Sequence, residues 1–379
     1  MKRDPDQSRV SCLHPWWIRF AVGGMVLLVS FCSCYAQFAG RPVSADAMEI
    51  DYMGRVLKKE DGAVSLDWPG TSIRFDLQGS WCAMRVSDTG TSYYHVFVDD
   101  SLHRIIQVVG RDTLIVLVDG LENKRHSIRL QKRSEAQFGR TRIFSFLPGE
   151  GGKLFATRGR KTRHIEFIGD SFTCGYGTDG SHRDESFSVE TENADKTYAC
   201  ILSRYFDADY TLLAHSGRGA VRNYGDAVRV SHYTMKDAVK FVLDTDTSQR
   251  YIASHKPDLV VVFLGTNDFS TQPEPKRAEF KKGYGQLLTW LREQYGEVPI
   301  LCVIPAVGER VEGYIRELVA ERQDNRLVHT ASLRNVINDT TDLGAGWHPG
   351  YLGHQKMAMF LLPYVSTLMD WPLTERHVK

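Results

Sequence analysis

Residues 164–178 read HIEFIGDSFTCGYGT, an apolar run that leads directly into Gly-Asp-Ser and then into a glycine-rich turn. An apolar strand followed by a sharp turn into a helix is the place where an α/β fold presents a nucleophilic serine, here Ser171. The same residues also fit a loop in which Ser171 only caps the next helix. The rest of the chain decides between these two interpretations.

Strands and helices alternate after this stretch. The pattern predicts strands at 165–168, 211–214, 259–264, 300–304 and 327–330, and helices at 197–206, 276–293, 309–321 and 353–369. The run 259–264 (LVVVFL) is apolar on both faces, as a central parallel strand is when helices cover both sides of a sheet. We therefore predict that residues 158–379 form a three-layer α/β/α domain around a parallel sheet.

Residues 37–157 instead contain short apolar or alternating runs, separated by turn residues such as Pro-Gly, Asp-Gly and Asp-Asp. Strands of this length and spacing are typical of a sandwich of antiparallel sheets, and we predict a jelly roll. The polar, basic segment 158–163 (RGRKTR) separates the two patterns and is interpreted as a solvated linker at the domain boundary. The predicted fold is thus an N-terminal β-sandwich followed by an α/β domain.

Residues 1–36 have the pattern of a signal peptide. Basic residues precede an apolar run at 20–31, and small residues precede a cut after Ala36. Two alternatives stay open: an uncleaved anchor, although about twelve apolar residues are short for a bilayer, and lipidation at Cys32 or Cys34. We expect export to the periplasm, the cell surface or the medium, and no stable membrane span once the signal has been removed.

The composition excludes several kinds of function. A formal net charge of +1 over 379 residues provides no basic surface for nucleic acid or an anionic membrane. Cysteines beyond the predicted signal are too few and too scattered for a disulfide framework, and we expect them to be buried as small apolar groups: Cys82, Cys174, Cys200 and Cys302. No C-x-x-C pair or cluster of His and Asp ligands stands out, so neither a metal nor a cofactor is expected. The sequence does not give the oligomeric state.

Three further loops fall at strand ends of the predicted parallel sheet, and they contain Gly219, Asn267 and, near the C-terminus, His348. Because the carboxyl ends of parallel strands line one edge of a sheet, these loops can meet Ser171. Together they suit acyl transfer, in which Ser171 attacks a carbonyl carbon and His348 moves the proton. The N–H groups of Ser171 and Gly219 and the amide of Asn267 would then stabilise the oxyanion.

Each of these residues also fits an ordinary structural role. Gly219 fits the end of a tight turn, and Asn267 fits an Asx turn that caps a helix. His348 is also consistent with a histidine in a loop that has no catalytic role. His215 is the best alternative base, although it lies next to the proposed oxyanion loop. The occurrence of four such pieces in order, each at a strand end, favours the nucleophile interpretation of Ser171.

The four blocks resemble those of the SGNH hydrolases: GDS (169–171), Gly219, GTND (265–268) and His348. Longer stretches resemble the family-2 carbohydrate esterases, which are acetyl esterases with an N-terminal jelly roll followed by an SGNH domain. These stretches are KRSE (132–135), IEFIGDS (165–171) with CGYG (174–177), SGRGAVRNYG (216–225), and WHP (347–349) with GHQ (353–355). The similarity covers most of the chain from about residue 46 onward.

One position departs from the family pattern. SGNH hydrolases usually carry an aspartate three residues before the histidine, where this chain has Ala345, and some of the esterases carry the acid two residues before it, where this chain has Gly346. The nearest upstream acids are Asp342 and Asp339. A histidine in such a site needs an acceptor for its second N–H, and a backbone carbonyl serves as well as a carboxylate.

The family also includes members that work as a Ser-His dyad, in which the carbonyl of the tryptophan before the histidine is the acceptor. By this resemblance we predict a Ser171–His348 dyad oriented by the Trp347 carbonyl, with Asp342 as the alternative third member. The Trp347 ring is expected to stack on a sugar ring of the substrate or to pack under the last helix, and the two roles are compatible because they can use different faces of the ring.

The resemblance implies a cofactor-free carbohydrate O-acetyl esterase that hydrolyses acetyl esters on plant polysaccharides or oligosaccharides through an acetyl-serine intermediate. One alternative is an SGNH lipase or lysophospholipase, which needs an extended apolar channel for its acyl chain. Another is a non-catalytic glycan-binding protein, for which the missing acid at position 345 is the support. The sugar and the acetylated hydroxyl are not given by the sequence.

Overall fold

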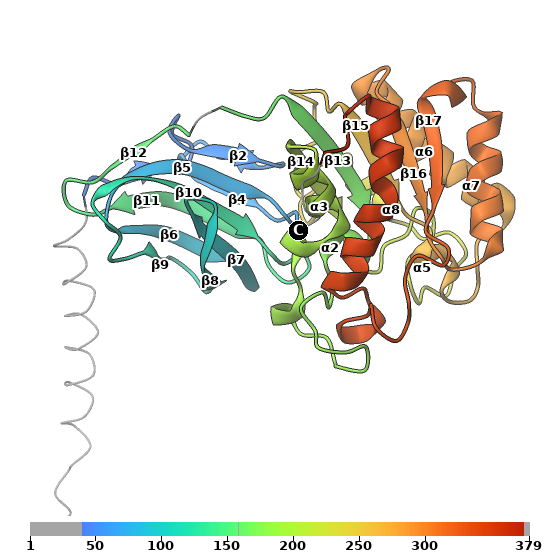
Figure 1. The fold of residues 1–379 in the computed structure, drawn as a ribbon, viewed down its shortest axis with the longest axis horizontal. Coiled ribbons are helices and arrows are strands. Elements are labelled where there is room, and N and C mark those ends of the chain that lie inside the picture. Colours follow the sequence, from blue (N-terminus) through green and yellow to red (C-terminus); the bar gives the residue numbers. More distant parts are fainter. Residues whose placement is uncertain (1–39, 158, 375–379) are drawn as a thin grey trace, which may run out of the picture.

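The computed structural model describes residues 40–157 and 159–374. It consists of a β-sandwich packed against an α/β half (Figure 1). The predicted signal peptide, including Cys32 and Cys34, lies outside the described residues. Within them, every helix is too short or too polar to cross a lipid bilayer.

The N-terminal half contains two antiparallel sheets of six strands each. The first has the order β3 (Leu57–Lys58), β4 (Val64–Leu66), β11 (Thr141–Pro148), β6 (Cys82–Asp88) and β9 (Thr113–Val118), with β1 (Val43–Ser44) paired to β11. The second has the order β12 (Lys153–Phe155), β5 (Ser72–Gly79), β10 (Lys124–Lys132), β7 (Thr91–Val98) and β8 (Ser101–Val109), with β2 (Asp51–Met53) paired to β5.

The alternation of buried and partly exposed side chains along the strands explains why these sheets stack. In β5 the side chains of Ile73, Phe75 and Leu77 are fully buried, while the residues between them are partly exposed. Phe75 of the second sheet meets Phe146 of the first with their ring centroids 5.0 Å apart. Apolar faces of both sheets thus form one core, and the predicted all-β jelly-roll half is confirmed.

The C-terminal half is built on a parallel sheet with the order β14 (Ala208–Ala214), β13 (Arg163–Gly169), β15 (Leu259–Phe263), β16 (Ile300–Ile304) and β17 (Val328–Ser332). Its longer helices are α3 (Tyr198–Tyr205), α6 (Arg277–Tyr295), α7 (Glu309–Glu321) and α8 (Tyr351–Met369). Short helical turns lie in the loops: α2 (Ser171–Cys174), η1 (Val189–Thr191), η2 (Ala194–Lys196), α4 (Met235–Ala238), α5 (Thr266–Phe269), η3 (Asn325–Leu327) and η4 (Ala345–Trp347).

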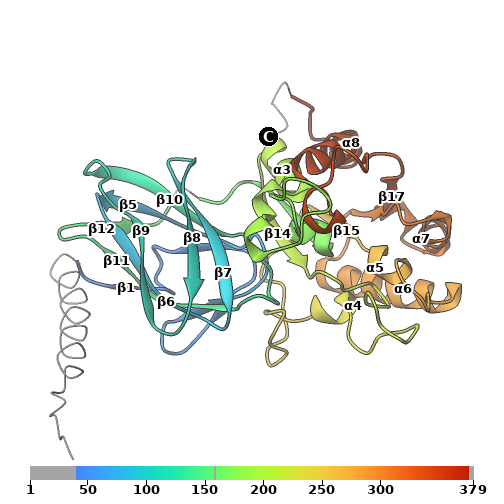
Figure 2. The same ribbon diagram turned by 90° about the horizontal axis from the view of Figure 1, so that it is seen from below.

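Helices cover both faces of this sheet. Residues of α3 and α8 form the core on one face, and residues of α4, α6 and α7 form it on the other. Figure 2 shows α3 and α8 on one side and α4 and α6 on the opposite side. The predicted three-layer α/β/α arrangement is confirmed, and each predicted strand and long helix is present with ends that differ by a few residues at most.

The register of the sheet places three strand ends together. Gly169 at the end of β13 pairs with Ala214 of β14 on one side and with Phe263 of β15 on the other. The loops that follow these three strands therefore start at the same edge of the sheet.

Between the two halves, β12 ends at Phe155 and β13 begins at Arg163. The predicted linker is more than a solvated connection, because Arg160 Nη2 donates to the carbonyl of Tyr52 over 2.8 Å. The division into domains at residue 157 stays a prediction.

The cysteines Cys82, Cys174, Cys200 and Cys302 are buried, as predicted, and are free thiols.

Trp68 ties the sandwich to the α/β half. Its side chain is fully buried within the core that α6 and α7 share with the parallel sheet. Its indole Nε1 donates to the carbonyl of Val242 over 2.9 Å. A large aromatic side chain from one half therefore completes the core of the other.

Replacing Trp68 with alanine should lower the free energy of unfolding by about 3–5 kcal/mol, because the substitution leaves a cavity and removes the donor to Val242. Urea unfolding followed by circular dichroism would measure the loss. The control is Leu102→Ala on β8, where the side chain is 52% exposed and the expected change is within about 0.5 kcal/mol. Equal stabilities for the two variants would contradict this account of the interface.

Candidate active site

Ser171 is the first residue of α2, directly after β13, and its side chain is almost fully buried. Asp170 is the residue that caps this helix, since its Oδ1 accepts from the N–H of Phe172 over 3.2 Å. A Cβ on Gly169 would lie 2.0 Å from Oγ1 of Thr173. Only glycine therefore allows the strand to turn so tightly into α2, and the Ser171 hydroxyl is left available for another partner.

That partner is His348. Its Nε2 lies 2.8 Å from Oγ of Ser171, and its Nδ1 lies 2.7 Å from the carbonyl oxygen of Gly346. A carbonyl only accepts, so Nδ1 carries the proton and a neutral ring presents the unprotonated Nε2 to Ser171. The hydroxyl thus donates to a nitrogen that is able to take its proton.

The acceptor for His348 differs from the prediction. Gly346, and not Trp347, supplies the carbonyl. The reason is local backbone geometry: Gly346 has φ 63° and ψ 32°, and Trp347 has φ 61°. Two successive left-handed residues fold the chain back before His348, so the carbonyl two residues earlier meets its ring.

Asp342, the alternative third member, is bonded elsewhere. Its carboxylate accepts from Nζ of Lys356 over 2.7 and 2.8 Å and from the N–H of Asn338 over 2.7 Å. Burial raises its pKa, but the bonds from Lys356 and Asn338 outweigh burial and hold the pKa below its ordinary value. Asp342 therefore secures the loop that carries His348 and does not bond to the imidazole.

The surroundings of His348 favour its neutral form. The ring of Tyr176 lies 4.5 Å and the ring of Phe172 lies 5.6 Å from the imidazole, between centroids. Burial lowers the pKa of His348, and the bond to the Gly346 carbonyl opposes this only in part. The imidazole is thus unprotonated at neutral pH, as a general base has to be.

Asn267 connects the loop of Ser171 to the loop after β14. Its Nδ2 donates to the carbonyl of Arg218 over 2.9 Å and lies 3.4 Å from Oδ2 of Asp170. The N–H of Gly219, the other predicted donor, points to Oδ1 of Asn223 over a long 3.3 Å. Asn267, Arg218 and Asp170 therefore lie together at the edge where β13, β14 and β15 end.

The sequence interpretation missed the role of Asp268. This fully buried carboxylate accepts from three successive backbone N–H groups, those of Ala220, Val221 and Arg222, at 3.0, 2.8 and 2.8 Å. Burial raises its pKa to about 6, against the effect of these N–H groups. Asp268 clamps the chain directly after Gly219, and the only sequence signal was its place beside Asn267.

Two basic residues of this loop are also structural. The side chain of Arg222 is fully buried, and its guanidinium donates to four backbone carbonyls, those of Val228, Thr271, Asp226 and Gln272. Arg218 forms an ion pair with the buried Asp244. His215, the rival base, bonds through Nδ1 to the same carboxylate over 2.5 Å.

Trp347 is 57% exposed and lies next to the candidate dyad in the chain. The guanidinium of Arg183 lies 4.3 Å from its ring centroid. The ring also lines a cavity of about 230 Å³ together with Phe172, Phe263 and Leu343. The exposed part of the residue is open to a ligand, and the expected stacking on a sugar ring stays a prediction.

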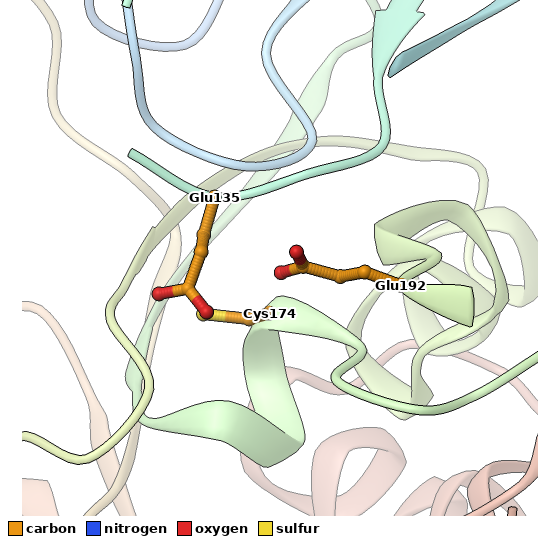
Figure 3. A group of neighbouring side chains, drawn as sticks. All are labelled: Glu135, Cys174 and Glu192. Atoms are coloured by element: carbon orange, nitrogen blue, oxygen red, sulfur yellow. The ribbon is translucent and has the colours of Figure 1, made fainter. Parts of the chain in front are cut away.

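One group of potential metal ligands occurs among the described residues: Glu135, Cys174 and Glu192 (Figure 3). All three are fully buried, and their ligand atoms lie within 4.8 Å of one another. Neither carboxylate oxygen of Glu192 has a hydrogen-bond partner. Burial and the charge of Glu135 raise the pKa of Glu192 well above its ordinary value.

Comparison with known proteins identifies both halves. Residues 52–157 match the carbohydrate esterase 2 N-terminal family, and residues 167–356 match the GDSL-like lipase/acylhydrolase family. A crystal structure of a family two carbohydrate esterase from Clostridium thermocellum in complex with cellohexaose superimposes with a TM-score of 0.79 at 29% identity, over 85% of this chain and 100% of that chain.

Two curated relatives extend the similarity. The cellulase/esterase CelE of Acetivibrio thermocellus is 29% identical over 330 residues, which are 84% of this chain but only 39% of that protein. An acetylxylan esterase / glucomannan deacetylase of Cellvibrio japonicus is 26% identical over 363 residues, which are 91% of this chain and 96% of that protein. The chain belongs to the GDSL-like lipase/acylhydrolase family, and in both of its halves it is similar to the family 2 carbohydrate esterases.

Proposed function

We propose that the protein is a carbohydrate O-acetyl esterase with Ser171 as nucleophile and His348 as general base. The observation that carries the proposal is the pair of bonds at the imidazole, 2.8 Å from Nε2 to Ser171 Oγ and 2.7 Å from Nδ1 to the Gly346 carbonyl. The names of the relatives, which include acetylxylan esterase and glucomannan deacetylase, support acetylated plant glycans as substrates.

The proposed reaction has two halves. Ser171 Oγ attacks the acetyl carbonyl carbon while Nε2 of His348 takes its proton, and the proton then passes to the sugar oxygen as the ester C–O bond breaks. Water attacks the acetyl-serine in the same way and releases acetate. No carboxylate takes part, because the Gly346 carbonyl holds the imidazole in the required tautomer.

The oxyanion would be stabilised by the N–H groups of Ser171 and Gly219 and by the amide of Asn267. The N–H of Gly219 makes only a long contact, 3.3 Å to Asn223, and Asn267 donates to the Arg218 carbonyl at 2.9 Å while its amide nitrogen lies 3.4 Å from Asp170. A negatively charged oxygen is a stronger acceptor than either long-range partner, so it can compete for the N–H of Gly219 and for the second amide hydrogen of Asn267.

The exposed face of Trp347 is suited to stack on a pyranose ring next to the nucleophile. Together with the names of the relatives, this favours an acetylated sugar as the substrate over a lipid. The export of the protein stays a prediction from its N-terminal sequence.

Ser171→Ala should lower acetate release by at least about 10⁴-fold, because the substitution removes the nucleophile. Acetate would be measured from acetylated glucomannan, acetylated xylan and acetylated monosaccharides, beside an aryl ester series of increasing acyl length. Wild-type protein should prefer acetyl esters and give a burst with an aryl acetate. The control is Ser101→Ala in β8, which lies at the surface. Turnover that survives in Ser171→Ala, or a preference for long acyl chains, would contradict the proposal.

The pH profile of kcat/KM should fall on the acid side with a midpoint below 6.5, the ordinary pKa of histidine, because burial lowers the pKa of His348. The sign follows from the chemistry: His348 accepts a proton only when neutral, so activity is present above its pKa and lost as the pH falls through it. Rates with an aryl acetate over roughly pH 4–8 would test this. A midpoint above 6.5 would assign the base to another group.

Asp342→Asn should retain kcat within about threefold, because this carboxylate bonds to Lys356 and the loop backbone and not to His348. The variant should instead lose stability, and Lys356→Met, which removes the same ion pair, is its matched control. Steady-state kinetics and thermal unfolding would be measured on both. A loss of several orders of magnitude in kcat by a folded Asp342→Asn protein would instead indicate a catalytic triad that includes Asp342.

A further inference from the structure

Segment 132–135, the KRSE stretch that follows β10, reaches from the sandwich into the α/β half. Arg133 Nη2 donates to Oδ2 of Asp179 over 2.8 Å and to the carbonyl of Glu190 over 2.9 Å. The carbonyl of Arg133 accepts from the N–H of Ala194 over 3.1 Å. These bonds fix the segment beside the loops that follow β13.

Glu135 at the end of this segment holds the start of the candidate oxyanion loop. Its Oε2 accepts from the N–H of Ser216 over 2.7 Å, and its Oε1 accepts from Nε2 of Gln137 over 2.9 Å. Ser216 comes shortly after the end of β14 at Ala214 and shortly before Gly219. The Glu135 side chain is fully buried, and a hydrogen bond from a backbone N–H to a carboxylate is short and strong in such surroundings.

The same loop is held at its other end from within the α/β half. Asn267 binds the carbonyl of Arg218, and Asp268 binds the N–H groups that follow Gly219. The donor Gly219 therefore lies in a short segment that Glu135 holds at Ser216 and Asp268 holds at Ala220 and Val221. Loss of either carboxylate frees one end of this segment.

Glu135 also lies against the turn that carries the nucleophile. Cys174 is the last residue of α2, the helix that begins with Ser171, and its Sγ is within 4.8 Å of the carboxylate atoms of Glu135 and Glu192. Figure 3 shows Glu135 coming from the sandwich side and pointing down toward Cys174, with Glu192 directed to the same place. One carboxylate from the sandwich thus bonds to the loop of an oxyanion donor and lies close to the helix that presents the nucleophile.

Lys132 of the same segment is also fully buried, and its Nζ donates to the carbonyls of Ser134 and Glu135 at 2.7 and 3.3 Å. These bonds hold the backbone of the segment that carries the Glu135 side chain.

We propose that Glu135 is a positioning residue of the esterase, supplied by the β-sandwich, which sets the oxyanion loop through its bond to the N–H of Ser216. The proposal rests on the proposed function. It gives the sandwich a direct part in turnover that is separate from glycan binding and from the stability of the interface.

Glu135→Ala removes the acceptor and should lower kcat with an aryl acetate by about 100-fold while KM stays within about threefold, because a displacement near 1 Å at the reacting groups costs this much. Glu135→Gln retains an oxygen that can accept from Ser216 and should lose no more than about tenfold. Glu135→Asp keeps the charge but withdraws the carboxylate oxygens from Ser216 by one methylene. This variant takes the place of Glu135→Ala in the test if the alanine variant does not fold.

The matched control is Arg74→Met, which breaks one ion pair between the two halves, to Asp209 at 2.9 Å, and one within the sandwich, to Asp51 at 2.9 Å, both away from the oxyanion loop. It should lower the melting temperature and leave kcat unchanged. A loss of kcat in Arg74→Met equal to that in Glu135→Ala would reduce Glu135 to a general interface contact. Full activity in Glu135→Ala, or loss of wild-type activity on chelation with EDTA, would overturn the proposal.

The amide signal of Ser216 in ¹⁵N NMR spectra separates this proposal from the proposed function. Its proton should shift upfield in Glu135→Ala and stay near the wild-type position in Glu135→Gln, whether or not a substrate is known. An unmoved Ser216 signal would overturn the positioning role by itself. A wild-type protein that hydrolyses aryl acetate but no acetylated glycan would instead refute the substrate assignment and leave the role of Glu135 intact.

Discussion

The pairing of β13 between β14 and β15 is the constraint on which the candidate site depends. Gly169 faces Ala214 on one side and Phe263 on the other, so the three following loops begin at the same edge of the sheet, with neighbouring strands about 5 Å apart. Ser171, the loop of Gly219 and the pair Asn267-Asp268 meet for this reason. His348 reaches the same edge from a loop near the C-terminus, just before α8.

Buried polar groups then hold these loops in one arrangement. Three carboxylates bind backbone N–H groups of the loops, since Asp170 caps α2, Asp268 receives three N–H groups, and Glu135 receives the N–H of Ser216. Each replaces water at backbone groups that would otherwise be unpaired in the interior. Because each has a specific geometry, the site is preorganised before any substrate arrives.

Much of this could be predicted from the sequence because it depends on local pattern. The strands around β13 and β15 follow from apolar runs, and the juxtaposition of Ser171 with His348 follows from the order of the blocks. The Gly346 carbonyl could not be predicted, since every residue has a carbonyl and only the left-handed geometry of Gly346 and Trp347 selects this one. The bond from Glu135 to Ser216 was equally hidden, because it joins the two halves of the chain.

The contacts of segment 132–135 and of Trp68 limit how the two halves of this protein can be separated or joined to parts of other proteins. The chain can be cut in the linker after β12, but the excised α/β half would lack an aromatic piece of its own core and a carboxylate beside its nucleophile turn. A chimera that joins this α/β half to a foreign sandwich would need both features transplanted with it. For protein engineering the two halves therefore form one unit, unlike a catalytic domain with a glycan-binding module on a tether.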